Sequence, residues 1–205
     1  MPQQHYFSEQ PQTDAKTHSV EFELEGTVFN LTAASGTFSS TRLDSGTRVL
    51  LKESALFPDS GTVLDIGCGW GPISLAVATL RPETEVFGLD VNSRSLELAQ
   101  ANAAALKLKN FKAVRAEQIP NELLFDGIWS NPPIRVGKAV LHQLMQTWIP
   151  RLKPGASAML VVQKQLGADS FQKWLAETFT EFDVAKQSID KGYRVIRVTN
   201  SAKPQ

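Results

Sequence analysis

The chain has 205 residues, 42% of them hydrophobic and 20% charged, which are the proportions of a globular protein and exclude a disordered or fibrous one. Its 21 Lys and Arg balance 21 Asp and Glu, so any nucleic-acid binding must depend on local basic clusters. The single cysteine, Cys68, excludes an internal disulfide framework and indicates a reducing compartment. Since no signal peptide or membrane-length apolar run is present, we expect a cytoplasmic protein without membrane contact.

An N-terminal extension is expected over residues 1–58. Residues 1 to about 18 are polar and are expected to run loosely over the surface. In SVEFELEGTVFNLT, a two-residue turn at Glu25-Gly26 would bring six apolar or small residues to one face, which predicts a β-hairpin. A helix is expected from about 47 to 56. The facing hairpin pairs are Leu24 with Thr27, Phe22 with Phe29, and Val20 with Leu31.

From Thr62 the pattern alternates between apolar strands and helices, which predicts a parallel sheet covered on both faces. The last two strands are too close in sequence for a parallel crossover, so they should form an antiparallel hairpin turning near Lys191-Gly192. The predicted fold is α/β: a doubly wound, mostly parallel seven-stranded Rossmann-like sheet over residues 59–200, followed by a 201–205 tail. The expected strands are 62–66, 85–90, 111–115, 125–130, 156–163, 182–187 and 193–199. The expected helices are 72–80, 93–107, 138–148 and 168–178.

A glycine-rich loop, VLDIGCGWGP, follows the first strand of this sheet and opens a helix. Gly67 and Gly69 let backbone approach a ligand near free N–H groups at the helix start, as in nucleotide-binding folds. A dinucleotide site would need a third glycine at position 72, which is Pro72, so a nicotinamide oxidoreductase is disfavoured. Asp90 ends the second strand, where a carboxylate can accept both hydroxyls of a ribose.

The stretch SNPPIRVG follows the fourth strand, which should neighbour the first strand at the point where the strand order reverses. Asn131, Pro132 and Pro133 should therefore face the glycine loop across one crevice. If the Asn131 side-chain oxygen and the Pro132 carbonyl each accept one N–H, an amino nitrogen can direct its lone pair at a methyl donor. The prolines hold this backbone extended and rigid, which predicts an amino-group methyltransferase site.

The loop DIGCGWG resembles motif I of the class I S-adenosylmethionine-dependent methyltransferases. The resemblance implies S-adenosylmethionine as cofactor. It implies that Asp65, Gly67 and Gly69 hold the amino-acid part of the cofactor, and that Asp90 holds its ribose. In RAEQIP, it implies that Glu117 or Gln118 reads the adenine.

The sequence from about Val20 to Ile196 resembles the single-domain, RsmC-like branch of the ribosomal small-subunit guanine-N2 methyltransferases with the "methyltransferase small" domain. GTFSSTRLDSGTRVLL, SNPPIRVGKAVLHQLM and KGYRVI carry this resemblance. Where many amino-group methyltransferases have an aromatic residue after the prolines, this chain has Ile134, which favours guanine over adenine or glutamine. The resemblance implies a role in closing over the cofactor or contacting substrate for further residues. They are Phe38 and Asp44 at the cofactor, and Ile134 and Lys138 at the substrate. We further expect Arg135 to contact an RNA phosphate or to stack on a flipped guanine in place of the missing ring, and Lys164 to contact RNA.

The expected activity is therefore methylation of guanine N2 in 16S rRNA, with ribosomal RNA or the small subunit as partner. A second interpretation is methylation of an amide or amine on a protein or small molecule. A third is a catalytically silent module that binds the cofactor and RNA; the intact triplet at Asn131 disfavours it, because only turnover needs that geometry. No metal site is predicted, and the sequence leaves the oligomeric state open.

Overall fold

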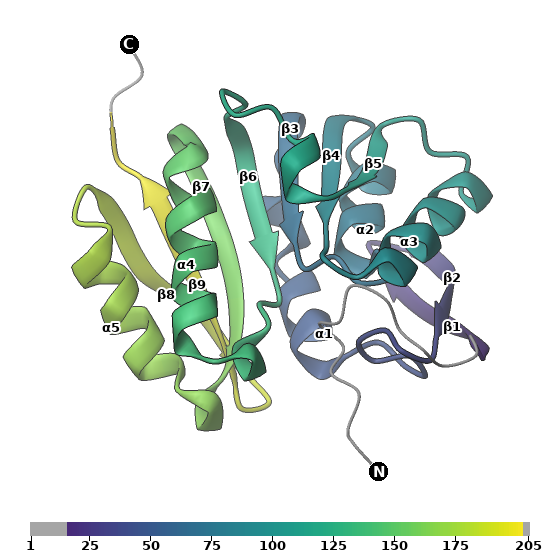
Figure 1. Ribbon diagram of the computed structural model, residues 1–205, viewed down its shortest axis with the longest axis horizontal. Helices are drawn as coiled ribbons and strands as arrows, with labels where there is room; N and C mark the ends of the chain where they lie inside the picture. Colours follow the sequence, from purple (N-terminus) through teal and green to yellow (C-terminus); the bar gives the residue numbers. More distant parts are fainter. Residues whose placement is uncertain (1–15, 203–205) are drawn as a thin grey trace.

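The computed structural model describes residues 16–202, apart from the side chain of Arg135. The predicted loose course of the first residues, up to residue 15, and the last three residues of the tail lie outside this part. A seven-stranded sheet runs through the molecule, with helices packed on both faces (Figure 1). The strands of the sheet are β3 (Ser60–Ile66), β4 (Glu83–Leu89), β5 (Phe111–Val114), β6 (Phe125–Ser130), β7 (Leu152–Gln163), β8 (Phe182–Asp190) and β9 (Tyr193–Asn200).

The strand order is β5-β4-β3-β6-β7-β9-β8. All neighbouring strands from β5 to β7 are parallel, whereas β9 is antiparallel to both β7 and β8. The turn between β8 and β9 has left-handed residues at Lys191 and Gly192. The predicted parallel sheet with an antiparallel C-terminal hairpin is confirmed.

The N-terminal hairpin is confirmed in the predicted register. It consists of β1 (Thr17–Leu24) and β2 (Thr27–Ala34), and Phe22 pairs with Phe29, their rings stacked 4.9 Å apart. Glu25 and Gly26 both have positive φ, as a turn with the twist of a hairpin requires. The Asn102 side chain accepts from Thr32 N and donates to Thr32 O, at 2.8 Å each, and so fastens β2 to the sheet-covering helices.

Five helices and several short 3-10 turns connect these strands. The helices are α1 (Ser45–Leu51), α2 (Pro72–Leu80), α3 (Ser93–Ala105), α4 (Lys138–Trp148) and α5 (Ala168–Thr178). The 3-10 turns are η1 (Ser54–Leu56), η2 (Ala116–Gln118), η3 (Ile134–Val136), η4 (Ile149–Arg151) and η5 (Lys164–Leu166). No helix within residues 16–202 is long and apolar enough to cross a bilayer.

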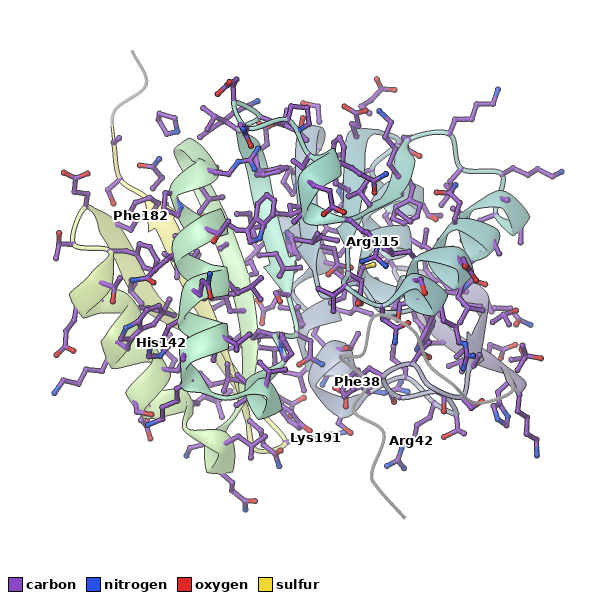
Figure 2. All side chains as sticks on the ribbon, in the orientation of Figure 1. Phe38, Arg42, Arg115, His142, Phe182 and Lys191 are labelled. Carbon is purple, nitrogen blue, oxygen red and sulfur yellow. The ribbon has the colours of Figure 1, made fainter. Side chains whose placement is uncertain are left out.

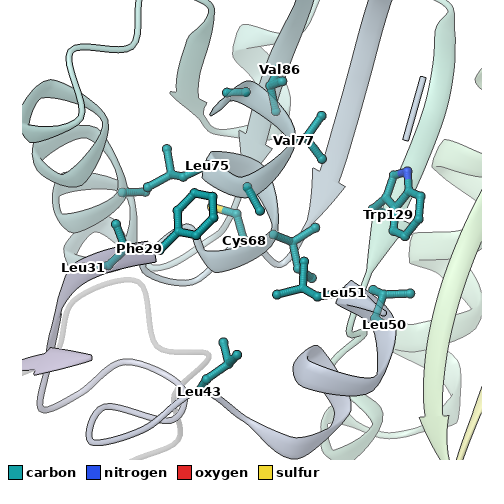
Figure 3. Close-up of a cluster of buried hydrophobic side chains, with 14 of the residues drawn as sticks. Phe29, Leu31, Leu43, Leu50, Leu51, Cys68, Leu75, Val77, Val86 and Trp129 are labelled. Atoms are coloured by element: carbon teal, nitrogen blue, oxygen red, sulfur yellow. The ribbon is translucent and has the colours of Figure 1, made fainter. Parts of the chain in front are cut away.

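Side chains alternate between two hydrophobic clusters, one on each face of the sheet, as period-two strands require. In β7, Met159 and Val161 join the cluster with α1, α2, α3 and the hairpin, and Leu160 and Val162 join the cluster with α4 and α5. Figure 3 shows part of the first cluster, including Trp129. Both faces of the sheet are therefore covered by helices or by the hairpin. A ligand can reach the sheet at the ends of its strands.

The boundaries of α1 and β7 differ most from the sequence expectation, whereas those of the other strands and helices agree within three residues. The helix expected at 47–56 begins at Ser45, because the Asp44 side chain accepts from the N–H groups of Gly46 and Thr47 as an N-cap. It ends at Leu51 and is followed by the separate turn η1. β7 begins at Leu152 rather than 156, because Leu152 pairs with Phe125 before a register shift.

Candidate functional site

The two motifs singled out in the sequence meet where β3 and β6 end. These strands are parallel neighbours, and the Ser130 hydroxyl donates to the Ile66 carbonyl at 2.7 Å. Gly67 has φ +74°, and a Cβ added there would lie 3.9 Å from Pro133 Cδ. The glycine loop and the Asn-Pro-Pro triplet therefore lie side by side at the ends of these strands, as the predicted crevice requires.

The glycine loop is held to the sheet on one side and open on the other. The N–H groups of Gly67 and Cys68 both donate to the Leu89 carbonyl, at 2.8 and 2.9 Å. A Cβ at Gly69, where φ is +57°, would meet nothing within 4 Å. Cys68 is buried, and its Sγ lies 3.1 Å from where a Cβ of Gly88 would sit. Cys68 belongs to the hydrophobic cluster on this face of the sheet, so its side chain packs in the core.

Asp65, at the end of β3, is buried, and only one of its two carboxyl oxygens accepts hydrogen bonds. Its Oδ2 accepts hydrogen bonds from the backbone N–H and the hydroxyl of Ser74, whereas its Oδ1 has no partner among the described residues. Burial raises the pKa of Asp65 to about 7, although the bonds from Ser74 act in the opposite direction. An unsatisfied acidic oxygen beside an open loop suits a cationic ligand.

We expect Asp65→Asn to flatten part of the pH dependence of stability. Because the folded-state pKa of Asp65 is raised, the unfolded chain releases this proton first as the pH rises, and the folded state loses stability between about pH 4 and about pH 7. The variant should therefore gain a few kcal/mol relative to wild type across this window, since one pKa unit is about 1.4 kcal/mol. Urea unfolding of both proteins at pH 4, 5.5 and 8 measures this difference, and parallel pH profiles would contradict it.

Asp90, after β4, is positioned by backbone donors. Its Oδ2 accepts from Gly69 N and its Oδ1 from Asn92 N, both at 2.9 Å. Burial raises the pKa of Asp90, while these bonds and the nearby Arg115 counteract the rise. Each carboxylate oxygen retains a lone pair, so the group can still accept two hydroxyls. Val91, the next residue in the chain, exposes 52% of its surface.

The two candidate adenine-reading residues lie in η2, after β5, and differ in their contacts. The Gln118 side-chain oxygen accepts from Arg115 N at 2.7 Å and so closes the local turn. Glu117 is exposed. The role of either residue stays a prediction, because the Gln118 oxygen keeps a second lone pair and its amide nitrogen keeps its donors.

The segment between β2 and α1 crosses the glycine loop. The Trp70 indole donates to the Phe38 carbonyl at 3.1 Å, and the Asn92 side chain donates to the Gly36 carbonyl at 3.0 Å. Phe38 is 44% exposed and lies close to α1 (Figure 2). Its contact with the cofactor stays a prediction, but its backbone is attached to the predicted cofactor loop. Trp70 was not selected from the sequence because a tryptophan in a glycine loop has no distinctive spacing.

Asn131 is held by the N-terminus of α1. Its Nδ2 donates to Asp44 Oδ2 at 2.8 Å and to Thr47 Oγ1 at 3.1 Å. Since a carboxylate only accepts, the amide nitrogen must face α1, and Oδ1 remains as the acceptor for another group. The Asp44 carboxylate caps α1 and accepts from Asn131, and its predicted role at the cofactor stays a prediction. Thr47 was missed; the helix-start signal LDSGT could have identified it.

The two prolines form a tight turn. Pro133 has φ −74° and ψ 72°, and Ile134 N donates to the Pro132 carbonyl at 2.8 Å, as in an inverse γ-turn. One lone pair of this carbonyl is thus used within the turn, and the second is left for a ligand. The turn fixes the carbonyl next to the Asn131 amide.

The predicted substrate residues lie at the rim of the crevice. Ile134 is half-buried and packs against the cluster beneath α4. Lys138 and Lys164 are exposed at the first positions of α4 and η5. The side chain of Arg135 is outside the described part of the structure, so its proposed contact stays a prediction.

Comparison with known proteins gives a consistent result. The family model "Methyltransferase small domain" matches residues 28–197. The uncharacterized protein YbxB of Bacillus subtilis is 34% identical over 95% of this chain and 97% of its own length. Ribosomal RNA small subunit methyltransferase C of Salmonella typhi is 33% identical over 95% of this chain and 56% of its own length.

Among solved structures, the T. thermophilus 16S rRNA N2 methyltransferase RsmC, in complex with AdoMet and guanosine, superposes with a TM-score of 0.76. It is 26% identical, and the match covers 93% of this chain and 52% of that one. The chain thus spans about half the length of these two rRNA methyltransferases.

Proposed function

The chain belongs to the methyltransferase small domain family, and on this premise we propose that it transfers a methyl group from S-adenosylmethionine to guanine N2 in small-subunit rRNA. The observation that carries the proposal is the fixed amide of Asn131, which presents an oxygen acceptor opposite a glycine loop. An acceptor at this point selects a substrate group that carries N–H donors, such as an exocyclic amine.

The crevice has the donor and acceptor set that S-adenosylmethionine requires. The unpartnered Asp65 oxygen would attract its ammonium group, the open backbone at Gly69 would admit its amino-acid part, and Asp90 would accept the ribose hydroxyls. When bound, this cofactor supplies an electrophilic methyl group on a sulfonium.

The residues of the chain would then orient the amino nitrogen. The lone pair of an exocyclic amine is delocalised into its ring, so the amine needs alignment and charge stabilisation rather than a strong base. Asn131 Oδ1 and the remaining lone pair of the Pro132 carbonyl would each accept one N–H and direct the nitrogen lone pair toward the methyl group. Both dipoles, and the Asp44 carboxylate behind the amide, would stabilise the positive charge that develops on nitrogen.

Guanine is supported by the relatives and by one residue of this chain. The structurally similar RsmC was solved with guanosine, and the relative from Salmonella typhi is a small-subunit rRNA methyltransferase. Ile134 stands where adenine- and glutamine-modifying enzymes have an aromatic ring. An rRNA substrate also implies that the protein is located in the cytoplasm. The chain spans about half the length of these enzymes. Recognition of the target nucleotide by this chain is therefore also part of the proposal.

Nucleoside analysis tests the proposal directly. The protein is incubated with methyl-labelled S-adenosylmethionine and small subunits from a strain that lacks it, and the RNA is digested and chromatographed. We expect label in N2-methylguanosine, and an initial rate of labelling at least about a hundredfold lower with Asn131→Ala. Label in N6-methyladenosine would change the substrate to adenine, and label only in protein would overturn an RNA substrate. No label in either fraction would leave the protein as a binding module.

A further inference from the structure

The residue after the Asn-Pro-Pro triplet does not provide a surface on which a base can stack. Ile134 has no ring, and it packs against the hydrophobic cluster on the α4 side of the sheet. Enzymes that modify a nucleobase extrude it from its stack and hold it against aromatic or apolar side chains. If the proposed function holds, another ring should lie beside Asn131.

Tyr193 has this position. It is the first residue of β9 and pairs with Gln163 at the end of β7. A Cβ added at Gly46 would lie 3.0 Å from Tyr193 Cε1 and 3.3 Å from Asn131 Nδ2, so the ring and the amide flank the same buried glycine. Tyr193 is half-buried: part of its ring packs against the hydrophobic cluster on the α1 side of the sheet, and the rest of its surface is accessible.

The order of the strands places Tyr193 on the side of Asn131 away from Gly67 and Asp90, two of the predicted cofactor residues. Gly67 and Asp90 follow β3 and β4, which lie on one side of β6, whereas β7 and β9 lie on the other side. A base that enters beside Tyr193 would therefore meet Asn131 with its edge, while the methyl donor approaches from the glycine loop. The two ligands would not compete for the same space.

Two lysines, Lys164 and Lys191, lie in the segments next to Tyr193. Lys191 is exposed in the turn before β9, and Lys164 N donates to Gly192 O at 2.8 Å, which joins the end of β7 to this turn. The acidic residue of the turn, Asp190, is already paired with Lys52 at 2.6 Å. Figure 2 shows Lys191 near the same edge of the molecule as Phe38. Ammonium groups here suit the phosphates on either side of an extruded nucleotide.

We propose that Tyr193 forms the stacking wall for the target base, a purine extruded from single-stranded or opened RNA, and that Lys164 and Lys191 contact the adjacent phosphates. Gly46 keeps the ring close to the Asn131 amide, because any side chain there would meet both groups. This inference rests on the proposed function and adds to it the residue that binds the base.

Substitution kinetics test the stacking wall. Tyr193→Leu should raise the KM for RNA about tenfold or more, in keeping with the loss of one base–aromatic stack, while the Kd for S-adenosylmethionine stays unchanged. Tyr193→Phe keeps the ring and should retain the KM of wild type. A KM for Tyr193→Leu equal to that of wild type, or a Tyr193→Phe defect as large as that of Tyr193→Leu, would overturn the role of the ring.

Phe182→Leu is the matched control. Phe182 starts β8 and lies at the opposite end of the same hairpin from Lys191 (Figure 2), where it contacts Phe179 edge-on. Like Tyr193 it is half-buried, so the two leucine variants should lose similar stability. Only Tyr193→Leu should change the KM for RNA, and an equal change in Phe182→Leu would mean that destabilisation of the hairpin is the cause.

A binding measurement separates this inference from the proposed function. The chain has two tyrosines, Tyr6 and Tyr193, so 3-fluorotyrosine labelling should give two fluorine resonances, and Tyr193→Phe assigns them. Guanosine, added with S-adenosylhomocysteine, should shift the Tyr193 resonance, and uridine should shift it much less. Turnover on RNA without this shift would overturn the inference alone. A shift without methylation of any RNA would overturn the proposed function and leave the purine site standing.

Discussion

Replacing Asn131 by alanine should lower kcat for RNA methylation by about two to three orders of magnitude, the effect expected when a preorganised group that stabilises transition-state charge is removed. The variant should keep the wild-type Kd for S-adenosylmethionine, because Asp65 and Asp90, the predicted contacts of its ammonium group and ribose, lie at the ends of β3 and β4 rather than β6. Single-turnover kinetics with saturating cofactor and RNA measure the effect on the chemical step, and titration calorimetry measures the affinity.

Asn200→Ala is the control for this experiment. Asn200 ends β9, and its amide donates to the Leu152 carbonyl at 2.8 Å, away from the crevice. Its loss should lower Tm slightly and leave kcat at the wild-type value. If Asn131→Ala keeps more than a tenth of the wild-type kcat, the side-chain oxygen is not the acceptor that aligns the amine, and the proposed mechanism fails.

Replacing Asp44, whose carboxylate holds the Asn131 amide, should have the second largest effect on kcat. Asp44→Ser keeps a residue that caps helices well but withdraws the carboxylate from Asn131 Nδ2. With only Thr47 left to hold it, the amide can turn, and we expect kcat to fall about 10- to 100-fold by loss of alignment. Asp44→Ala removes the cap as well and should cost about 0.5–2 kcal/mol of additional stability.

A double-mutant cycle shows whether Asp44 acts through Asn131. If it does, Asp44→Ser should lower kcat strongly in the wild-type background and hardly at all in Asn131→Ala. A structural role alone would instead lower Tm in both backgrounds and leave kcat of the folded protein unchanged. Additive effects on kcat would mean that Asp44 has a separate role, such as the predicted contact with the cofactor.

Most of the fold could be predicted because its signals are local. The hairpin register follows from alternation around Glu25-Gly26, and the parallel sheet follows from the alternation of strands and helices. The errors occurred where a tertiary contact overrides local pattern. Pro154 and Gly155 suggest a turn, yet they lie within β7, because Leu152 pairs with β6 before the register shift.

The sequence predicted which site residues lie together where the order of the strands determines their positions. It did not predict contacts between segments that are far apart in the chain. The meeting of Gly67 with Pro133 followed from the neighbouring positions of the first and fourth core strands. The bond from Asn131 to Asp44 joins residues 87 positions apart, and nothing in either local sequence specifies it. Tyr193 was overlooked for the same reason, since its position beside Gly46 depends on how α1 packs against β7 and β9.

The orientation of Cys68 has a consequence for resistance to oxidation. Hydrogen peroxide attacks the thiolate form of cysteine, and this thiol is both shielded and held protonated, because burial raises its pKa well above the usual value. The chain contains no other cysteine. Methyl transfer should therefore survive peroxide concentrations that inactivate enzymes with an exposed thiol at their cofactor loop, and alkylating reagents should modify the protein only after it unfolds.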